Sequence, residues 1–376
     1  MMLAPVVVLA AAIAAIVIAV VHVLSARQGF LRQCLLRVCC WLRGAHCVFV
    51  TDADTARRVL RASDTKGPII ERLLAGPAWA PVLSLESVDG AVWQRMRANF
   101  ARFHARLPPA TSLARMLADK ARARLASGAL LDSHALAGIV VRSFFEWMFD
   151  EPFLDEWEFV VDATWHWRRS IAQKGAADPA LKQRVVDWII GVLRRSRFQS
   201  VFGEGWSSPE CYSVVLQPFL ISPAINYVDV VVAVTSLPGH ERRPVGDLVA
   251  EALRQQHPFP ILERYVEQPV GDIPANSVVF IPFDTALAKC DPRHADQLVF
   301  GAGRRACPGM ALARSTLQAL LEATIGHERL QPCVGYRWSG RRNDGKETLP
   351  ETVFQITSFA RALAGLLIPG LGCTVS

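Results

Sequence analysis

The stretch Phe300–Gly309 reads FGAGRRACPG and places one cysteine, Cys307, directly before a predicted helix. From 310 to 321 apolar residues recur at the spacing of one helix face, and Pro308 suits a first helical position. At a helix N-terminus the dipole and the unpaired backbone N–H groups favour a thiolate over a thiol. A lone cysteine before a turn is more often a buried free thiol, so its assignment as a metal ligand depends on the residues around it.

Five residues of this stretch match the pattern FxxGxRxCxG, and through them the chain resembles the cytochrome P-450 family. They are Phe300, Gly303, Arg305, Cys307 and Gly309. The resemblance implies a haem b cofactor whose iron takes Cys307 as its axial ligand, because a soft anionic sulfur favours O–O cleavage. It also implies that Arg305 binds a haem propionate and that Phe300 covers the sulfur side. Gly303 would supply a tight turn, and Gly309 would let the backbone approach the sulfur.

Trp93 and Arg97 precede this stretch and share one face of a predicted helix, because they stand at i and i+4. On its own such a pair usually means packing beside a solvated charge. Upstream of a haem loop it resembles the family's propionate-binding helix, with an indole N–H and a guanidinium as donors. Arg264 stands where the family often places a further propionate ligand.

Glu251 and Arg254 form an ExxR pair, which in isolation is commonly an ordinary ion pair along a helix. Because His257, Pro258 and Pro260 and then the haem loop follow, the pair resembles the family's ExxR helix. Asp291-Pro292-Arg293-His294 resembles the segment that supplies a third member, Arg293. We expect the three side chains to brace the scaffold around the haem, since a buried carboxylate shared by two guanidiniums must be fully hydrogen-bonded.

Residues 222–226 stand where the family's long central helix carries Ala-Gly-x-acid-Thr across the distal face of the haem. There the acid and the threonine relay protons, which is general acid catalysis by positioned groups. In this chain Ile225 replaces the acid, and Asn226 supplies an amide in place of the hydroxyl. An amide holds a water or a peroxy group but passes a proton less readily. Asn226 is therefore the predicted catalytic residue, and the kind of reaction stays open.

The chain has 376 residues, of which 51% are hydrophobic and 20% charged, so it can bury a large core. The resemblance implies a mainly α fold with small β-sheets over residues 45–376, without repeats or linkers. Its spacings are compressed: Asn226 and Glu251 are only 25 positions apart. The family's first helix has no evident counterpart in the sequence, so we expect a shortened and divergent member of the family.

Val6–Leu24 is apolar apart from His22 and is long enough for one membrane span. A cleaved signal peptide is the rival interpretation, but the run is long and lacks a basic start and a clear cleavage site. We therefore expect a transmembrane signal anchor in residues 1–26, followed by a basic juxtamembrane segment, 27–44. By the positive-inside rule the haem domain then faces the cytosol, at a single-pass location such as the endoplasmic reticulum.

The net charge of +7 is diffuse, without the basic runs and interleaved aromatic residues typical of nucleic-acid binding. We expect anionic lipid headgroups and an acidic flavin-containing reductase as counterparts, the latter at the basic region of Arg95, Arg102 and Arg106. The nine cysteines do not suggest a disulfide framework in a cytosolic body.

The resemblance implies a haem-thiolate monooxygenase that oxidises a lipophilic small molecule with O2, with electrons from NADPH delivered by the reductase. The altered residues 222–226 support a second hypothesis, a reductase-independent hydroperoxide isomerase or dehydratase of the same fold. A third hypothesis is a non-catalytic membrane protein in which shortening of the haem domain has abolished haem binding or turnover. Turnover of a hydroperoxide without NADPH separates the first two, and failure to take up haem favours the third.

Overall fold

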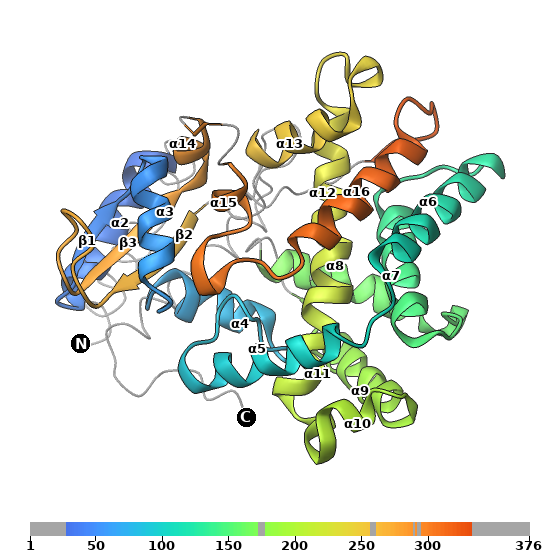
Figure 1. The fold of residues 1–376 in the computed structure, drawn as a ribbon, viewed down its shortest axis with the longest axis horizontal. Helices are drawn as coiled ribbons and strands as arrows, with labels where there is room; N and C mark the ends of the chain where they lie inside the picture. The colour runs from blue at the N-terminus through green and yellow to red at the C-terminus, as the bar shows by residue number, and fades with distance from the viewer. Residues whose placement is uncertain (1–27, 172–176, 256–260, 289, 292–294, 333–376) are drawn as a thin grey trace, which may run out of the picture.

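The computed structural model describes residues 28–171, 177–255, 261–288, 290–291 and 295–332. Within these ranges the chain is mainly helical, with a three-stranded sheet to one side of the helical bulk (Figure 1). The predicted fold class, mainly α with a small sheet, is confirmed. The predicted anchor in residues 1–26 and the predicted brace residue Arg293 lie outside the described residues.

The sheet has the strand order β1-β3-β2, with β1 (His46–Phe49) parallel to β3 (Ser277–Pro282) and β2 (Ile261–Val266) antiparallel to it. Asn276 precedes β3 with a φ of 56°, in the left-handed region that Asn tolerates, as expected for the turn of this hairpin. Cys47 pairs with Val278 and Arg264 with Val279, which fixes the side of the sheet on which each residue lies.

Two helices cover opposite faces of β3 because its side chains alternate between the faces. Val279 and Ile281 pack against α3 (Ala53–Ala62), and Val278 and Phe280 pack against α2 (Gln28–Leu42). Asp52 begins α3 by accepting a hydrogen bond from the Thr55 backbone at 2.7 Å.

The helix α2 corrects one expectation, that the family's first helix has no counterpart in this chain. It buries Leu36, Cys39 and Cys40, which stand at i, i+3 and i+4 and so form one apolar stripe against the sheet. The arginines and exposed apolar residues between them obscure this stripe in the sequence.

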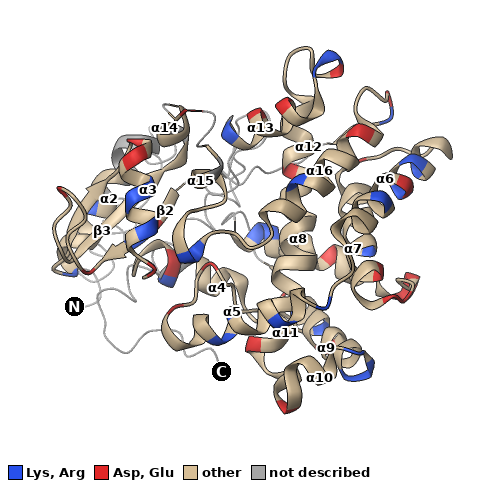
Figure 2. Ribbon diagram, viewed as in Figure 1, with Lys and Arg blue, Asp and Glu red and all other residues tan. Residues whose placement is uncertain are grey.

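The helical bulk buries one large apolar core, in which α16 packs on α6 and α13, and α12 packs on α7. Figure 2 shows basic and acidic residues interspersed along helices such as α6 and α13. The helices of eight or more residues in this part are α5 Gly90–His104, α6 Ala110–Ala126, α7 Ser133–Phe149, α8 Phe159–Ile171, α9 Pro179–Arg195, α11 Pro209–Leu216, α12 Ser222–Thr235, α13 Val245–Gln255 and α16 Met310–Thr324. Shorter pieces are α4 Gly76–Trp79, α10 Gln199–Phe202, α14 Phe283–Ala288 and α15 Asp296–Val299.

The helices α11 and α12 join through a π-helical turn, Gln217–Ile221, into one run from Pro209 to Thr235. Pro218 and Pro223 lie in this run, and the wider turn accommodates backbone positions that lack an N–H donor. Among the described residues this is the one helix long and apolar enough to cross a membrane, but 72% of its most apolar window is buried inside the protein. The run is therefore a core helix of this fold.

Candidate active site

A cavity lies between α5, α12, strand β2 and the loop that precedes α16. Eight of the residues predicted to form the site line it: Trp93, Arg97, Asn226, Arg264, Phe300, Arg305, Cys307 and Gly309. They come from four separate parts of the chain, so the fold brings them together as the resemblance implies. Gly303 is not at the cavity wall but shapes the loop behind it.

The loop before α16 turns at Gly301 and Gly303, whose φ angles are 73° and 72°. A Cβ atom on Gly303 would lie 2.8 Å from the Leu60 carbonyl oxygen, so this position needs glycine for space as well as for conformation. The backbone N–H of Cys307 donates to the Phe300 carbonyl oxygen at 2.7 Å and closes the loop. The loop is thereby held against α3 and fixes the position of Cys307.

Cys307 presents its thiol to the cavity two residues before the N-cap of α16, Gly309. Burial raises the pKa of the Cys307 thiol to about 11, and the Glu86 carboxylate adds to the rise. The Gly309 backbone N–H and Arg97 lower the pKa, but burial outweighs them. The helix terminus alone therefore does not hold a thiolate, contrary to our expectation, and a cation next to the sulfur is needed to do so.

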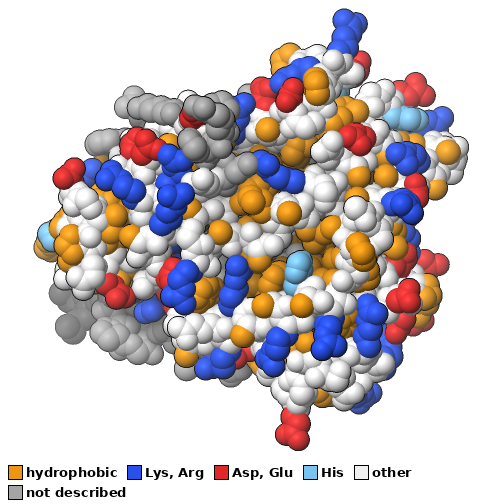
Figure 3. All heavy atoms as spheres, in the orientation of Figure 1, with side chains coloured by type: hydrophobic (Ala, Val, Ile, Leu, Met, Phe, Trp, Pro, Cys, Tyr) orange, Lys and Arg blue, Asp and Glu red, His pale blue; other side chains and the backbone are white. Residues whose placement is uncertain are grey.

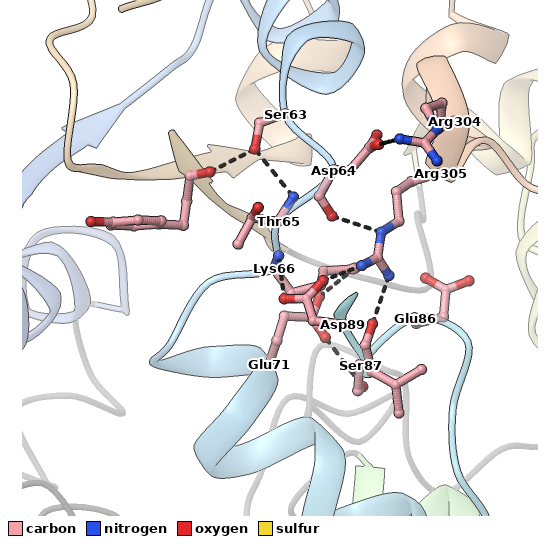
Figure 4. A network of polar contacts seen from close by, with 12 residues as sticks. Ser63, Asp64, Thr65, Lys66, Glu71, Glu86, Ser87, Asp89, Arg304 and Arg305 are labelled. Atoms are coloured by element: carbon pink, nitrogen blue, oxygen red, sulfur yellow. Dashed lines mark hydrogen bonds and ion pairs between the residues drawn. The ribbon is translucent and has the colours of Figure 1, made fainter. Parts of the chain in front are cut away.

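Arg305 lies at the cavity wall and extends its guanidinium into a polar network with the segment 64–89 (Figure 4). Its Nε donates to the Asp64 carbonyl oxygen at 2.7 Å, one Nη donates to the Val88 carbonyl oxygen at 2.8 Å, and the other pairs with the Asp89 carboxylate. Its side chain is only 3% exposed. All three nitrogens are thus engaged with protein, and binding a propionate would require one of these bonds to be given up.

Trp93 and Arg97 both face the cavity from α5, as their i, i+4 spacing predicts. The Trp93 ring lies 4.3 Å from the Arg305 guanidinium, in a cation–π contact. Arg97 makes one long hydrogen bond, 3.4 Å, to the Ala306 carbonyl oxygen. Its remaining donors have no hydrogen-bond partner among the described residues, so they can bind an anionic ligand.

Arg264 reaches the cavity from β2 and is only 2% exposed, and its Nε–H has no partner among the described residues. Sequence reasoning missed its neighbour Lys66, which is 5% exposed and pairs with Glu71 at 3.0 Å. It also missed Glu86, another lining residue. Lys66 and Glu86 lie in non-helical stretches on either side of α4, and no sequence pattern marks these two residues. The unpaired donor of Arg264 and the neighbouring cation of Lys66 make this end of the cavity suited to a carboxylate.

On the α12 side the cavity meets Asn226, whose Oδ1 is buried without a hydrogen-bond partner among the described residues. Next to it the Tyr227 hydroxyl is 2.5 Å from the Thr316 hydroxyl, which ties α12 to α16. The cavity-facing residues of α12 include no carboxylate. The α12 face of the cavity therefore lacks the family's acid, as the sequence suggests, and the Glu86 carboxylate reaches the cavity from another segment.

Within the described residues Glu251 pairs with Arg243, which is not one of the arginines predicted for the brace. Arg243 donates to the Glu251 carboxylate at 2.5 Å, and the Nε–H of Arg254 has no partner within the described ranges. Arg243 precedes α13 in the loop after α12, and its side chain reaches back to the helix. The role predicted for Arg293 lies outside the described residues.

The small mixed sheet, the helical bulk and the cysteine-bearing loop at the cavity define a class: the chain has the cytochrome P-450 fold. It is similar to a six-coordinated cytochrome P-450 from Thermus thermophilus, with 17% identity, a TM-score of 0.58, and coverage of 79% of this chain and 90% of that one. A cytochrome P-450 from a second strain of Thermus thermophilus is similar at 17% identity and a TM-score of 0.58, over 80% and 87% of the two chains.

A further solved structure is a cytochrome P-450 in complex with an acyl carrier protein ligated to hexadec-9Z-enoic acid. It is 15% identical to this chain, with a TM-score of 0.53 and coverage of 74% and 85%. No protein-family model matches the sequence, and no curated protein matches it. At these identities the likeness establishes the fold.

Proposed function

We propose that this protein is a haem-thiolate monooxygenase that oxidises a lipophilic small molecule with O2 and electrons from NADPH. The main support is that one cavity of a cytochrome P-450 fold contains both the Cys307 thiol and the unpaired Nε–H of buried Arg264. A cysteine sulfur can ligate haem iron, and a guanidinium can donate hydrogen bonds to a haem propionate. The donor set of the cavity therefore fits this cofactor.

In this proposal Cys307 ligates the iron, and Arg97 and Arg264 hold the propionates, with Trp93 and Lys66 beside them. Bound haem supplies the iron that activates oxygen. Phe300 and the apolar start of α16 keep water from the sulfur. Arg305 holds the loop before α16 against the segment 64–89, because its three nitrogens are bonded there.

The substrate side of the cavity is apolar, which supports a lipophilic substrate. Asn226 can hold a water by its amide but cannot release a proton as an acid does. Protons must then reach the distal side through water. This proton supply is the step on which the proposal and its alternative differ.

The alternative is a reductase-independent hydroperoxide isomerase or dehydratase. The observation that favours it is the lack of a carboxylate among the cavity-facing residues of α12. Such a reaction starts from an organic hydroperoxide and does not activate O2. It therefore does not need the acid and threonine that relay protons to bound oxygen. The amide of Asn226 would orient the peroxy group of the substrate.

The experiment that separates the two uses the purified, haem-loaded chain in lipid vesicles with a flavin-containing reductase. A monooxygenase consumes NADPH and incorporates one atom of labelled O2 into the organic product. A hydroperoxide enzyme turns over a fatty-acid hydroperoxide at the same rate with and without NADPH. A chain that takes up no haem would contradict both proposals and support a non-catalytic protein.

The basic side chains gathered over α5 support docking of an acidic reductase (Figure 3). Arg102 and Arg106 are exposed, whereas Arg95 is held by Glu210 in two hydrogen bonds of 2.7 Å. Replacing Arg102 and Arg106 by glutamate should raise the reductase concentration needed for half-maximal activity and leave haem content unchanged. An unchanged reductase dependence would contradict this docking site.

We further propose a single-pass membrane location, with the haem domain on the cytosolic side of the endoplasmic reticulum. Support comes from α2, which exposes Trp41, Val38 and Leu42 at 76%, 50% and 43%. Tryptophan and long apolar side chains suit the membrane interface, and α2 follows the predicted anchor in the chain. Protease protection of intact microsomes tests the orientation: digestion of the haem domain is expected, and full protection would contradict it.

A further inference from the structure

Gln217 occupies the first position of the π-helical turn Gln217–Ile221 that interrupts the run from α11 to α12. Such turns are uncommon and are frequently found at functional sites, because they redirect the side chains that follow. The cavity-lining residues of this run recur at 218, 222, 226 and 230. Gln217, at the start of the wide turn, also lines the cavity.

Gln217 is a buried polar side chain whose hydrogen bonding is incomplete. It is 5% exposed, and its Nε2 donates to the Ser222 hydroxyl at 3.0 Å. This bond orients the amide, and the carbonyl oxygen Oε1 has no partner among the described residues. A buried acceptor left unpaired is unfavourable, so such a group calls for a hydrogen-bond donor.

The surroundings of Gln217 in the cavity are apolar. Phe144, Phe219 and Val230 also line this cavity, and the cations Lys66, Arg97 and Arg264 come from other elements. Asn226 presents a second unpaired amide oxygen from the same run. The two amides are nine positions apart, which is roughly 13 Å along a helix.

We propose that Gln217 is a specificity-determining residue, which binds a hydroxyl or N–H donor of an otherwise apolar, elongated substrate. This inference rests on the proposed function for the location of the reaction and adds the class of substrate. The Oε1 atom accepts the hydrogen bond of the substrate, while Ser222 keeps the amide in place. The donor would lie at the end of the substrate remote from Asn226.

The test is calorimetric titration of the purified full chain with 1-decanol, undecane and 2-undecanone. The first carries a donor, the second has a methyl group in its place, and the third carries only an acceptor. Each ligand is titrated into wild type and Gln217→Met, which keeps the length of the side chain and removes its amide. A hydroxyl also loses its hydration on binding, so the informative quantity is the affinity ratio of one ligand between the two proteins.

We expect Gln217→Met to weaken binding of 1-decanol on the order of tenfold and to leave undecane within about twofold. Equal loss for all three ligands would overturn the proposal. Weakening of 2-undecanone instead of 1-decanol would overturn it as well, because the amide would then present its N–H2 group to the substrate. Gln183→Met, on the exposed side of α9, is the matched control and should change none of the affinities.

A stability measurement separates ligand recognition from a purely structural role. If Oε1 awaits a ligand, Gln217→Met removes an unpaired buried acceptor and raises the melting temperature of the ligand-free chain. If the Ser222 bond is needed for folding, the melting temperature falls and the proposal fails. Haem content is read from the absorption spectrum of the same samples, so an unchanged affinity of Gln217→Met for 1-decanol with haem still bound sinks this inference and leaves the proposed function standing.

Discussion

Glu263 gives this protein a predicted pH dependence of stability that can be worked out from its surroundings. The side chain lies on β2 with 0% exposure, and its two oxygens accept the backbone N–H groups of Ile69 and Glu71, each at 3.0 Å. A Cβ atom on Gly67 would lie 1.9 Å from the Cδ of Glu263, so the Glu263 side chain packs directly against the Gly67 backbone. Burial raises the pKa of Glu263 from 4.5 to about 7, although the two N–H groups lower it.

Because the folded state binds this proton more tightly than the unfolded chain, the stabilisation is complete below the unfolded pKa and is lost as the pH rises through about 7. With a pKa of 4.5 in the unfolded chain and about 7 in the folded protein, the unfolding free energy falls by about 2 kcal/mol between pH 5.5 and pH 8. An amide at this position cannot titrate, so Glu263→Gln should remove this part of the pH dependence.

The assay is urea denaturation at the two pH values, followed by tryptophan fluorescence. The change in unfolding free energy of wild type, minus that of Glu263→Gln, isolates the contribution of this carboxyl group. Asp119→Asn, at an exposed ion pair with Arg122, is the control and should keep the slope of wild type. Parallel pH dependence in wild type and Glu263→Gln would refute this account of the buried carboxyl group.

Two further substitutions test the loop before α16. Gly303→Ala should destabilise the protein by roughly 3 kcal/mol, because strain at a positive φ adds to the clash with Leu60. The control Gly326→Ala, at a φ of 76° in open space, should cost about 1 kcal/mol. Equal losses of stability in thermal unfolding would contradict the packing of the loop against Leu60. Asp89→Ala should cost about 3 kcal/mol because it leaves the buried guanidinium of Arg305 without its carboxylate. Asp89→Asn keeps one acceptor and should cost less by the same measurement. An Asp89→Ala variant as stable as wild type would show that the ion pair between Asp89 and Arg305 is not needed for stability.

Short-range patterns allowed much of the site to be predicted from the sequence. Trp93 and Arg97 share a helix face by spacing alone, and the turn at Gly303 follows from a residue type that tolerates a positive φ. The hairpin turn at Asn276 follows from the same property. Such features depend on neighbouring residues, which the sequence displays directly.

Long-range pairing was out of reach for the same physical reason. Arg305 finds Asp89 across 216 positions, and nothing in either neighbourhood indicates which donors of Arg305 the protein itself occupies. Burial decided two other outcomes: it raises the pKa of Cys307 against the helix terminus, and it hides Lys66 in an irregular segment. The reach of Arg243 to Glu251 depends on the path of a loop, which no periodicity records.

The most direct test of the haem-thiolate assignment is the absorption spectrum of the purified chain, reduced and exposed to carbon monoxide. Cys307→Ala is the variant, and Cys34→Ala, in α2 and remote from the cavity lining, is the matched control. We predict a strongly red-shifted Soret band in wild type and in the control that is absent from Cys307→Ala. A folded wild-type protein without bound haem, or the same band in Cys307→Ala, would contradict the central claim that this thiol holds the iron.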